Sequence, residues 1–422
     1  MMRSRAVLAL SGLLAVSWGL PRTAAAQDGG RAVESCVTCH SQLGGSFAAP
    51  VDSFPEDVHA RKGFGCVSCH GGNGTDPGLT AMDPEEGFVG KPERADVPLL
   101  CGRCHSDATF MKRFNPTLRV DQVPEYLTSV HGRRLMEAGD ENVATCVSCH
   151  PAHSIRPPTD PKSSVHPLRI ADLCGSCHAD STRMAAYGIP TDQREQYETS
   201  VHHRLLAEDG DLSAPTCNDC HGNHGAAPPG VSWVGNVCGQ CHALMADLFA
   251  GSRHAETFTF LGLPGCVTCH GNHAVAVTGD TLLGAADGAV CNRCHTEADA
   301  GGAAADEMRA LIDSLRVRLD TATALLGRAE NAGMEVSAAQ VDLSGAADAL
   351  IKSRTAVHAF DPEAVRREVE PGLEAAETGV VRGREALHDL WIRRVGLGVS
   401  VAIILVLIVG LVLKLRQIER ST

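Results

Sequence analysis

Nine copies of one pentapeptide, Cys-x-x-Cys-His, are the most informative feature of this sequence of 422 residues. They contain all 18 cysteines and nine of the 20 histidines. The cysteines are Cys36, Cys39, Cys66, Cys69, Cys101, Cys104, Cys146, Cys149, Cys174, Cys177, Cys217, Cys220, Cys238, Cys241, Cys266, Cys269, Cys291 and Cys294. The motif histidines are His40, His70, His105, His150, His178, His221, His242, His270 and His295. No cysteine is left for a disulfide or a free thiol, which argues against an ordinary cytosolic enzyme.

The spacing within the pentapeptide suits covalent haem attachment. Two cysteines three residues apart can each form a thioether with one vinyl group of a haem, and the next histidine then lies under the iron as an axial ligand. Paired cysteines also bind zinc, but zinc sites do not require a histidine after every second cysteine. Because all nine motifs carry that histidine, we expect nine covalently attached c-type haems.

The histidines outside the motifs are candidates for the second axial position. The segment that starts at Cys101 aligns with the one that starts at Cys174, and a fainter copy starts at Cys238. One set of histidines recurs ahead of a motif in this repeat, and another recurs three residues after a motif histidine. Together with His166, which precedes Cys174, they give eight predicted distal ligands. These are His59, His131, His153, His166, His202, His224, His254 and His273.

Eight distal ligands for nine haems leave one iron without a predicted partner. A histidine three residues after a motif histidine points to the same side of a helical turn, so it must ligate a neighbouring haem rather than its own. The first repeat has Asn73 in place of that histidine, which points to a haem near the N-terminal end as the exception. The open alternatives for this iron are no protein ligand, His203, Met111 and Met184. We interpret His358 and His388 by default as helix-surface histidines.

Over residues 36–295 the chain resembles the multihaem c-type cytochromes with tandem attachment motifs, of the cytochrome c3 and c554 type. The resemblance implies electron transfer. Aromatic residues make up only 4% of the chain, too few to pack such a domain, so we expect the haem macrocycles to form its core. The predicted fold class is mostly α: a haem-packed cytochrome domain with little regular structure, then a helical bundle or hairpin stalk and one C-terminal transmembrane helix.

Five segments follow from composition. A basic start, an apolar stretch and a small-residue end predict a signal peptide over residues 1–26. The nonahaem domain spans 27–295, as one leading haem plus four two-haem repeats. A stalk over 296–394 follows, with helices at 306–330, at 341–359 and from Asp361 onward, the last weakened or kinked at Pro371 and Gly372. Residues 395–413 are apolar and uncharged, which predicts a membrane span, and 414–422 form a cytoplasmic tail.

These features favour a membrane-anchored electron relay. The formal charge of −13 argues against nucleic acid as a partner and favours soluble cationic partners. We expect a membrane quinol-oxidising subunit or other cytochromes as redox partners, and a haem domain on the periplasmic side of the cytoplasmic membrane. Histidine on both sides of an iron leaves no open position and gives a low potential. The alternative is a nitrogen- or sulfur-compound oxidoreductase of the hydroxylamine, nitrite or tetrathionate type with one open haem site. We assign no catalytic residue.

Overall fold

The structure is a computed structural model that describes residues 34–227 and 235–420. The predicted signal peptide therefore lies outside the described residues. The chain divides into two compact units, residues 1–91 and 92–422. All regular elements of the described residues are helices, which confirms the predicted mostly α class.

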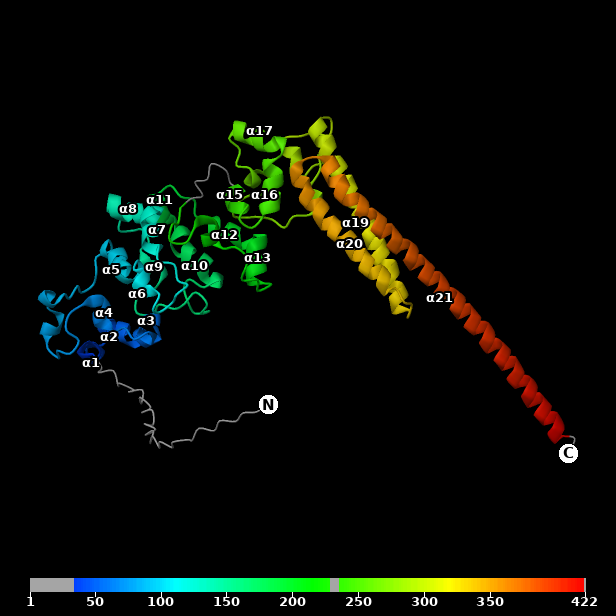
Figure 1. Ribbon diagram of the computed structural model, residues 1–422, viewed down its shortest axis with the longest axis horizontal. Helices are drawn as coiled ribbons and strands as arrows, with labels where there is room; N and C mark the ends of the chain where they lie inside the picture. The colour runs from blue at the N-terminus through cyan, green and yellow to red at the C-terminus, as the bar shows by residue number, and fades with distance from the viewer. Residues whose placement is uncertain (1–33, 228–234, 421–422) are drawn as a thin grey trace, which may run out of the picture. The chain divides into compact units, whose positions relative to one another are not determined.

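The first unit holds two motifs in short helices joined by turns (Figure 1). Its elements are α1 Ser35–Leu43, α2 Gly45–Ser53, η1 Phe54–Glu56, α3 Val58–Arg61, α4 Cys66–His70, η2 Leu79–Met82 and η3 Pro84–Glu86. Glu34 ties the two motifs together, because its Oε2 accepts a hydrogen bond of 2.8 Å from the Cys66 backbone N–H.

The second unit begins with short helices that carry the other seven motifs. They are α5 Asp96–His105, α6 Ala108–Met111, α7 Gln122–Thr128, α8 Val130–Ala138, α9 Cys146–Cys149, α10 Pro167–His178, α11 Ser181–Ala185, α12 Gln193–Glu198, α13 Val201–Ala207, α14 Cys217–His221, α15 Gly235–Cys238, α16 Ala243–Ala250, α17 Arg253–Leu261, α18 Cys266–His270, η4 Asp280–Leu282 and η5 Cys291–Arg293. The main apolar cluster confined to this part contains only Tyr126, Leu135 and Val143. Other buried apolar side chains of this part, such as Ile170, Tyr197 and Phe249, lie outside that cluster, which fits an interior filled by haem.

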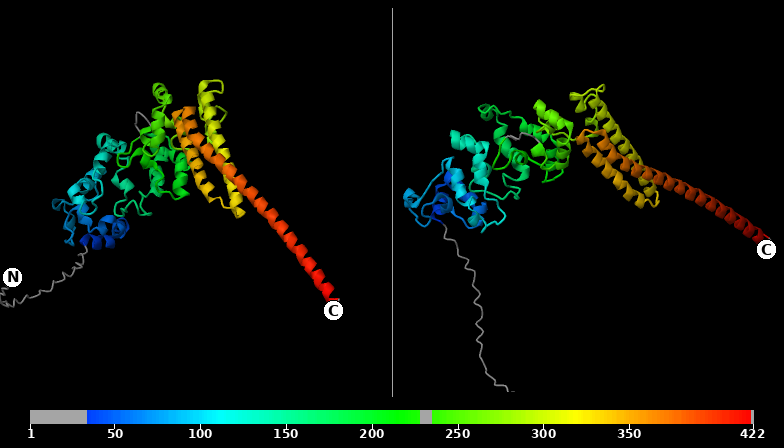
Figure 2. Two further views of the ribbon diagram at one scale, coloured as in Figure 1. Left: turned by 45° about the vertical axis from the view of Figure 1, so that its right-hand side comes forward. Right: turned by 45° about the horizontal axis from the view of Figure 1, so that its top comes forward.

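Three long helices complete the second unit and lie side by side in a bundle (Figures 1 and 2). They are α19 Ala300–Asn331, α20 Ser337–Ala356 and α21 Pro362–Glu419, with η6 Val357–Ala359 between the last two. The start of the third helix agrees with the sequence, since the Asp361 carboxylate accepts a hydrogen bond of 3.0 Å from the Glu363 N–H as an N-cap. These helices confirm the predicted bundle.

Small residues let the bundle helices approach closely. Ala322, Ala346 and Ala376 are fully buried beside Leu315 and Val380. Helix α21 runs through Pro371 and Gly372 as one element, although the sequence predicted a weak point there. A Cβ added at Gly372 would lie 2.6 Å from the Ala349 Cβ, so α20 packs directly against this part of α21. Tertiary packing therefore sustains the helix where local propensity is poor.

Helix α21 continues beyond the ends of α19 and α20 (Figure 1). It is the one helix among the described residues that is long and apolar enough to cross a membrane. Residues 391–420 are all exposed, so none of the described residues covers this apolar surface. A membrane anchor explains such a segment, and it contains the predicted span at 395–413.

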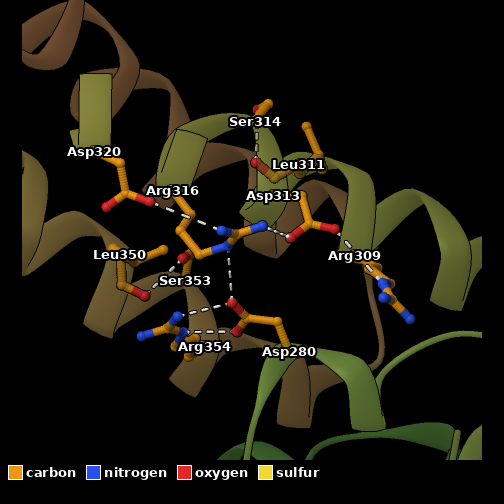
Figure 3. A network of polar contacts seen from close by, with 10 residues as sticks. All are labelled: Asp280, Arg309, Leu311, Asp313, Ser314, Arg316, Asp320, Leu350, Ser353 and Arg354. Atoms are coloured by element: carbon orange, nitrogen blue, oxygen red, sulfur yellow. Dashed lines mark hydrogen bonds and ion pairs between the residues drawn. The ribbon is translucent and has the colours of Figure 1, made fainter. Parts of the chain in front are cut away.

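An ion-pair network joins the segment after the eighth motif to the bundle (Figure 3). The Asp280 carboxylate accepts two hydrogen bonds of 2.8 Å from Nε and Nη2 of Arg354 on α20, and Arg316 on α19 lies 3.6 Å away. The Asp280 side chain is 13% exposed. The hydrogen bond from Arg354 is the main reason why the pKa of Asp280 lies below its usual range. This bidentate contact fixes the end of the haem region on the stalk.

We predict that Asp280→Asn destabilises this docking by about 1 kcal/mol at neutral pH. A carboxyl whose pKa is depressed in the folded state stabilises above its unfolded pKa of about 4 and loses that contribution as the pH falls further. The difference between variant and wild type should therefore disappear in acid. Thermal unfolding followed by far-ultraviolet circular dichroism measures it.

Asp320→Asn is the matched control. The Asp320 carboxylate is 69% exposed and 3.8 Å from Arg316, so its loss should change stability by less than about 0.5 kcal/mol. Equal effects of the two substitutions would contradict a special role for Asp280.

Candidate haem-binding sites

A serine precedes each helix that carries one of three predicted distal histidines. Ser129, Ser200 and Ser252 immediately precede helices α8, α13 and α17, and in each case the histidine is the second residue of the helix. The Ser129 hydroxyl accepts a hydrogen bond of 2.8 Å from the Gly132 N–H, and all three serines are buried. Because the cap fixes where the helix begins, it also fixes the direction of the following histidine. The caps thus orient His131 and His202, whereas the Ser252 hydroxyl donates to the Phe249 carbonyl and makes no cap hydrogen bond to α17.

Backbone hydrogen bonds bring the two kinds of predicted distal histidine together. The Val130 N–H donates to the Ala226 carbonyl at 3.1 Å, and the Val201 N–H donates to the Val275 carbonyl at 2.8 Å. Ala226 lies two residues after His224, and Val275 lies two residues after His273. The same contact therefore occurs in successive repeats, and it holds the start of one helix against the loop after a later motif.

Six motif histidines each lie across from a histidine outside the motifs. The ring centroids are 6.0–6.4 Å apart. The pairs are His178 with His131, His150 with His224, His242 with His202, His221 with His273, His295 with His254, and His270 with His358. Every pair contains one motif histidine and one histidine from outside the motifs. Five contain a predicted distal ligand, and the sixth contains His358, which sequence reasoning left on a helix surface.

The separation within these pairs fits a haem iron. Two imidazoles bound to one metal by bonds of about 2 Å have ring centres about 6 Å apart. Rings in direct stacking contact are closer, as His254 and Phe360 show at 3.9 Å. Among the described residues no three His, Cys, Asp or Glu side chains gather to hold a bare metal ion. Two imidazoles are, however, all that haem iron requires beside its porphyrin nitrogens, so the residues present fit this group.

Hydrogen bonds give several of these imidazoles the tautomer that a metal ligand needs. The Nδ1 atom lies 3.1 Å from the Ala227 carbonyl in His221, 3.0 Å from the Asp299 carboxylate in His295 and 2.7 Å from the Gly90 carbonyl in His70. An oxygen acceptor at this distance assigns the proton to Nδ1 and leaves the Nε2 lone pair for iron.

Burial keeps the distal imidazoles neutral. Burial and, to a smaller extent, His178 lower the pKa of His131 below its ordinary value. Burial followed by the motif partner lowers the pKa of His202 and His254 in the same way. A neutral imidazole keeps the lone pair with which it binds a metal.

Cysteine contacts show that successive motifs are neighbours in space. First cysteines are hydrogen-bonded between motifs in three pairs, Cys101 with Cys146, Cys174 with Cys217 and Cys238 with Cys266. Burial raises the pKa of three second cysteines, and a thiol of the following motif adds to each shift. Here Cys177 acts on Cys149, Cys241 on Cys220 and Cys291 on Cys269. The hydrogen bonds and the charge effects alternate, and together they relate each motif to the following one from residue 101 to residue 295.

The remaining predicted ligands occupy other settings. The ring of His59 lies beside the buried Asp57 carboxylate, with Nδ1 and Oδ1 2.9 Å apart, which suits the ligand tautomer. His153 has a left-handed backbone with φ of 67°. Nδ1 of His166 accepts a hydrogen bond of 3.3 Å from the Leu168 N–H and caps α10, which assigns the ring proton to Nε2, the opposite tautomer. Beside the motif histidine His40 lies Phe47, edge-on at 5.8 Å. Ligation by these three histidines, like that by the other predicted distal ligands, stays a prediction.

Tandem attachment motifs and paired imidazoles define a multihaem c-type cytochrome, whose activity is electron transfer. Comparison with family models supports this class for part of the chain, because residues 211–296 match the family described as cytochrome c3. That segment contains the motifs at 217–221, 238–242, 266–270 and 291–295, and it is a cytochrome c3 family domain. Comparisons with curated proteins and with solved structures give no match.

We predict that His202→Ala converts one low-spin haem per chain to high spin, because it removes the imidazole across from His242. Electron paramagnetic resonance of the oxidised protein, with visible spectroscopy, measures the change. Added imidazole should restore the low-spin signal.

His203→Ala is the matched control, since it removes the adjacent imidazole on the same helix. The ring of His203 lies 5.4 Å from that of Tyr197, edge-on. This variant should keep every low-spin signal, whereas loss of a low-spin haem in it alone would assign the ligand to His203.

Proposed function

We propose that this chain is a membrane-anchored nonahaem cytochrome that relays electrons between a quinol-linked donor in the membrane and a periplasmic or surface acceptor. The six histidine pairs carry the proposal. An iron with an imidazole on each face has no position for substrate, so such sites conduct electrons and have low potentials. The count of nine rests on the motifs at residues 36–295.

The series of motif contacts supports conduction along the chain. Hydrogen bonds and charge effects between cysteines relate each motif to the following one, from the motif at 101–105 to the motif at 291–295. Thioethers at these positions would hold neighbouring porphyrin edges close together. In the first unit, burial, Glu34 and then the charge effect of Cys36 raise the pKa of Cys66 to about 12.

The exposed end of α21 supports a single-pass anchor in the cytoplasmic membrane. Arg393 and Arg394 precede its apolar stretch, while Lys414 and Arg416 follow it. Because both ends are basic, these charges do not set the orientation. The predicted signal peptide does, by placing the haem region in the periplasm and the C-terminus in the cytoplasm.

The length and composition of α21 limit where the redox centre of the electron donor can lie. Residues 362–394 form roughly 50 Å of helix between the turn at η6 and the apolar stretch, at about 1.5 Å per residue. The span at 395–413 contains no histidine, so this chain supplies no haem ligand inside the bilayer. We therefore propose a separate quinol-oxidising subunit, or another cytochrome, that presents a redox centre outside the hydrocarbon core.

A second candidate function is an oxidoreductase with one open haem, and the surroundings of His40 favour it. The ring beside this motif histidine is that of Phe47, which has no atom able to bind iron. Nitrite or hydroxylamine bound there would shift the Soret band, and the protein would consume the compound in a turnover assay. The relay predicts neither effect.

We predict that a chain truncated after Arg394 is found in the soluble fraction instead of the membrane fraction. The haem content of this truncated chain should be unchanged. Its haems should no longer be reduced when quinol is added to membranes, since the link to the membrane donor is lost. Cell fractionation, haem staining and reduced-minus-oxidised spectra measure these outcomes. Membrane retention of the truncated chain, or its undiminished reduction by quinol, would refute the proposed anchor.

A further inference from the structure

The helical stalk contributes one histidine to the haem region. His358 lies in η6, the single turn between α20 and α21, and its ring centroid is 6.1 Å from that of the motif histidine His270. This distance falls within the range of the other five pairs. We propose that His358 is the distal axial ligand of the haem attached at Cys266 and Cys269. The inference rests on haem attachment there, which the proposed function includes.

The hydrogen bonding of His358 suits this role. Its Nδ1 lies 3.0 Å from the Thr355 carbonyl in the last turn of α20. Because a carbonyl only accepts, Nδ1 carries the proton and the Nε2 lone pair is available.

The order of pairing in the repeats explains why the stalk is needed at this motif. His224 follows the motif at 217–221 and lies across from His150, two motifs earlier. His273 follows the motif at 266–270 and lies across from His221, again two motifs earlier. By this rule His270 requires a histidine from a motif two places later, but the motif at 291–295 is the last. His358 takes the vacant place in the series.

The same turn also supports the neighbouring pair. Phe360 has a left-handed backbone with φ of 54°, which is unusual for a bulky residue. The Phe360 ring stacks on that of His254 at 3.9 Å, and the ring of Phe249 packs edge-on against Phe360. Since His254 lies across from His295, the residues between α20 and α21 contact the distal side of the last two sites. A backbone conformation of this kind persists only where the surrounding contacts hold it, and here the rings of His254 and Phe249 contact Phe360.

The test uses the full-length, haem-loaded protein in detergent. His358→Ala should lose one low-spin haem per chain and gain one high-spin haem in electron paramagnetic resonance spectra, and added imidazole should reverse both changes. His388→Ala removes the other histidine of the stalk, whose ring lies beside Trp391, and should leave the spectrum unchanged. A complete low-spin spectrum in His358→Ala at full haem content would overturn the proposal.

A conservative variant covers the case in which His358→Ala does not accumulate. His358→Met retains an iron ligand, so it should stay low spin, show the near-infrared band of methionine-ligated ferric haem and raise the potential of one haem. The absence of that band with all haems attached would also overturn the proposal. Mass analysis of the peptide with Cys266 and Cys269 distinguishes a failure of the His358 proposal from a failure of the proposed function. A haem-free peptide would contradict the haem attachment that the proposed function includes.

Discussion

The fold of the haem region depends on paired imidazoles separated by the width of one iron site. The partners are far apart in the sequence, as with His150 and His224 or His270 and His358. Coordination bonds between them would connect segments that otherwise share few apolar contacts, since Tyr126, Leu135 and Val143 are the small apolar cluster found there. Metal binding then contributes directly to folding, because ligands so widely separated cannot form a site in the unfolded chain.

The bundle is stabilised by a different principle. Its buried residues are apolar side chains and alanines packed between three helices, with Gly372 allowing α20 and α21 to approach. Such packing requires no cofactor. The two parts meet at Asp280 with Arg354, and at the turn that carries His358 and Phe360. The end of the haem series and the start of the membrane helix are therefore adjacent along the chain, which links the position of the last haem sites to the anchor.

Most of the haem chemistry was accessible from the sequence, because attachment requires a local pattern and the repeats align. The bundle was also predictable, from helical spacing and from the Asp361 cap. The place of His358 was not, because pairing depends on three-dimensional proximity and this histidine lies outside the repeats. At His166 the same Ser-Val-His pattern as at His131 occurs, but the imidazole itself caps α10, whereas the ring of His131 lies across from a motif histidine. Helix α8 begins one residue before His131, whereas α10 begins one residue after His166, and this difference of two residues places the two imidazoles in different settings.

The staggered pairing has a consequence for the array as a whole. His202 precedes the motif at 217–221 and lies across from His242, the histidine of the motif after that one. His273 follows the motif at 266–270 and lies across from His221, two motifs earlier. If iron binds within these pairs, each site takes its ligands from two different repeats. Two motifs of one repeat would then not complete their sites alone, and the last repeat would require a ligand from outside the repeats, as at His358. A helix that both ends the array and continues toward the membrane meets that requirement at one terminus.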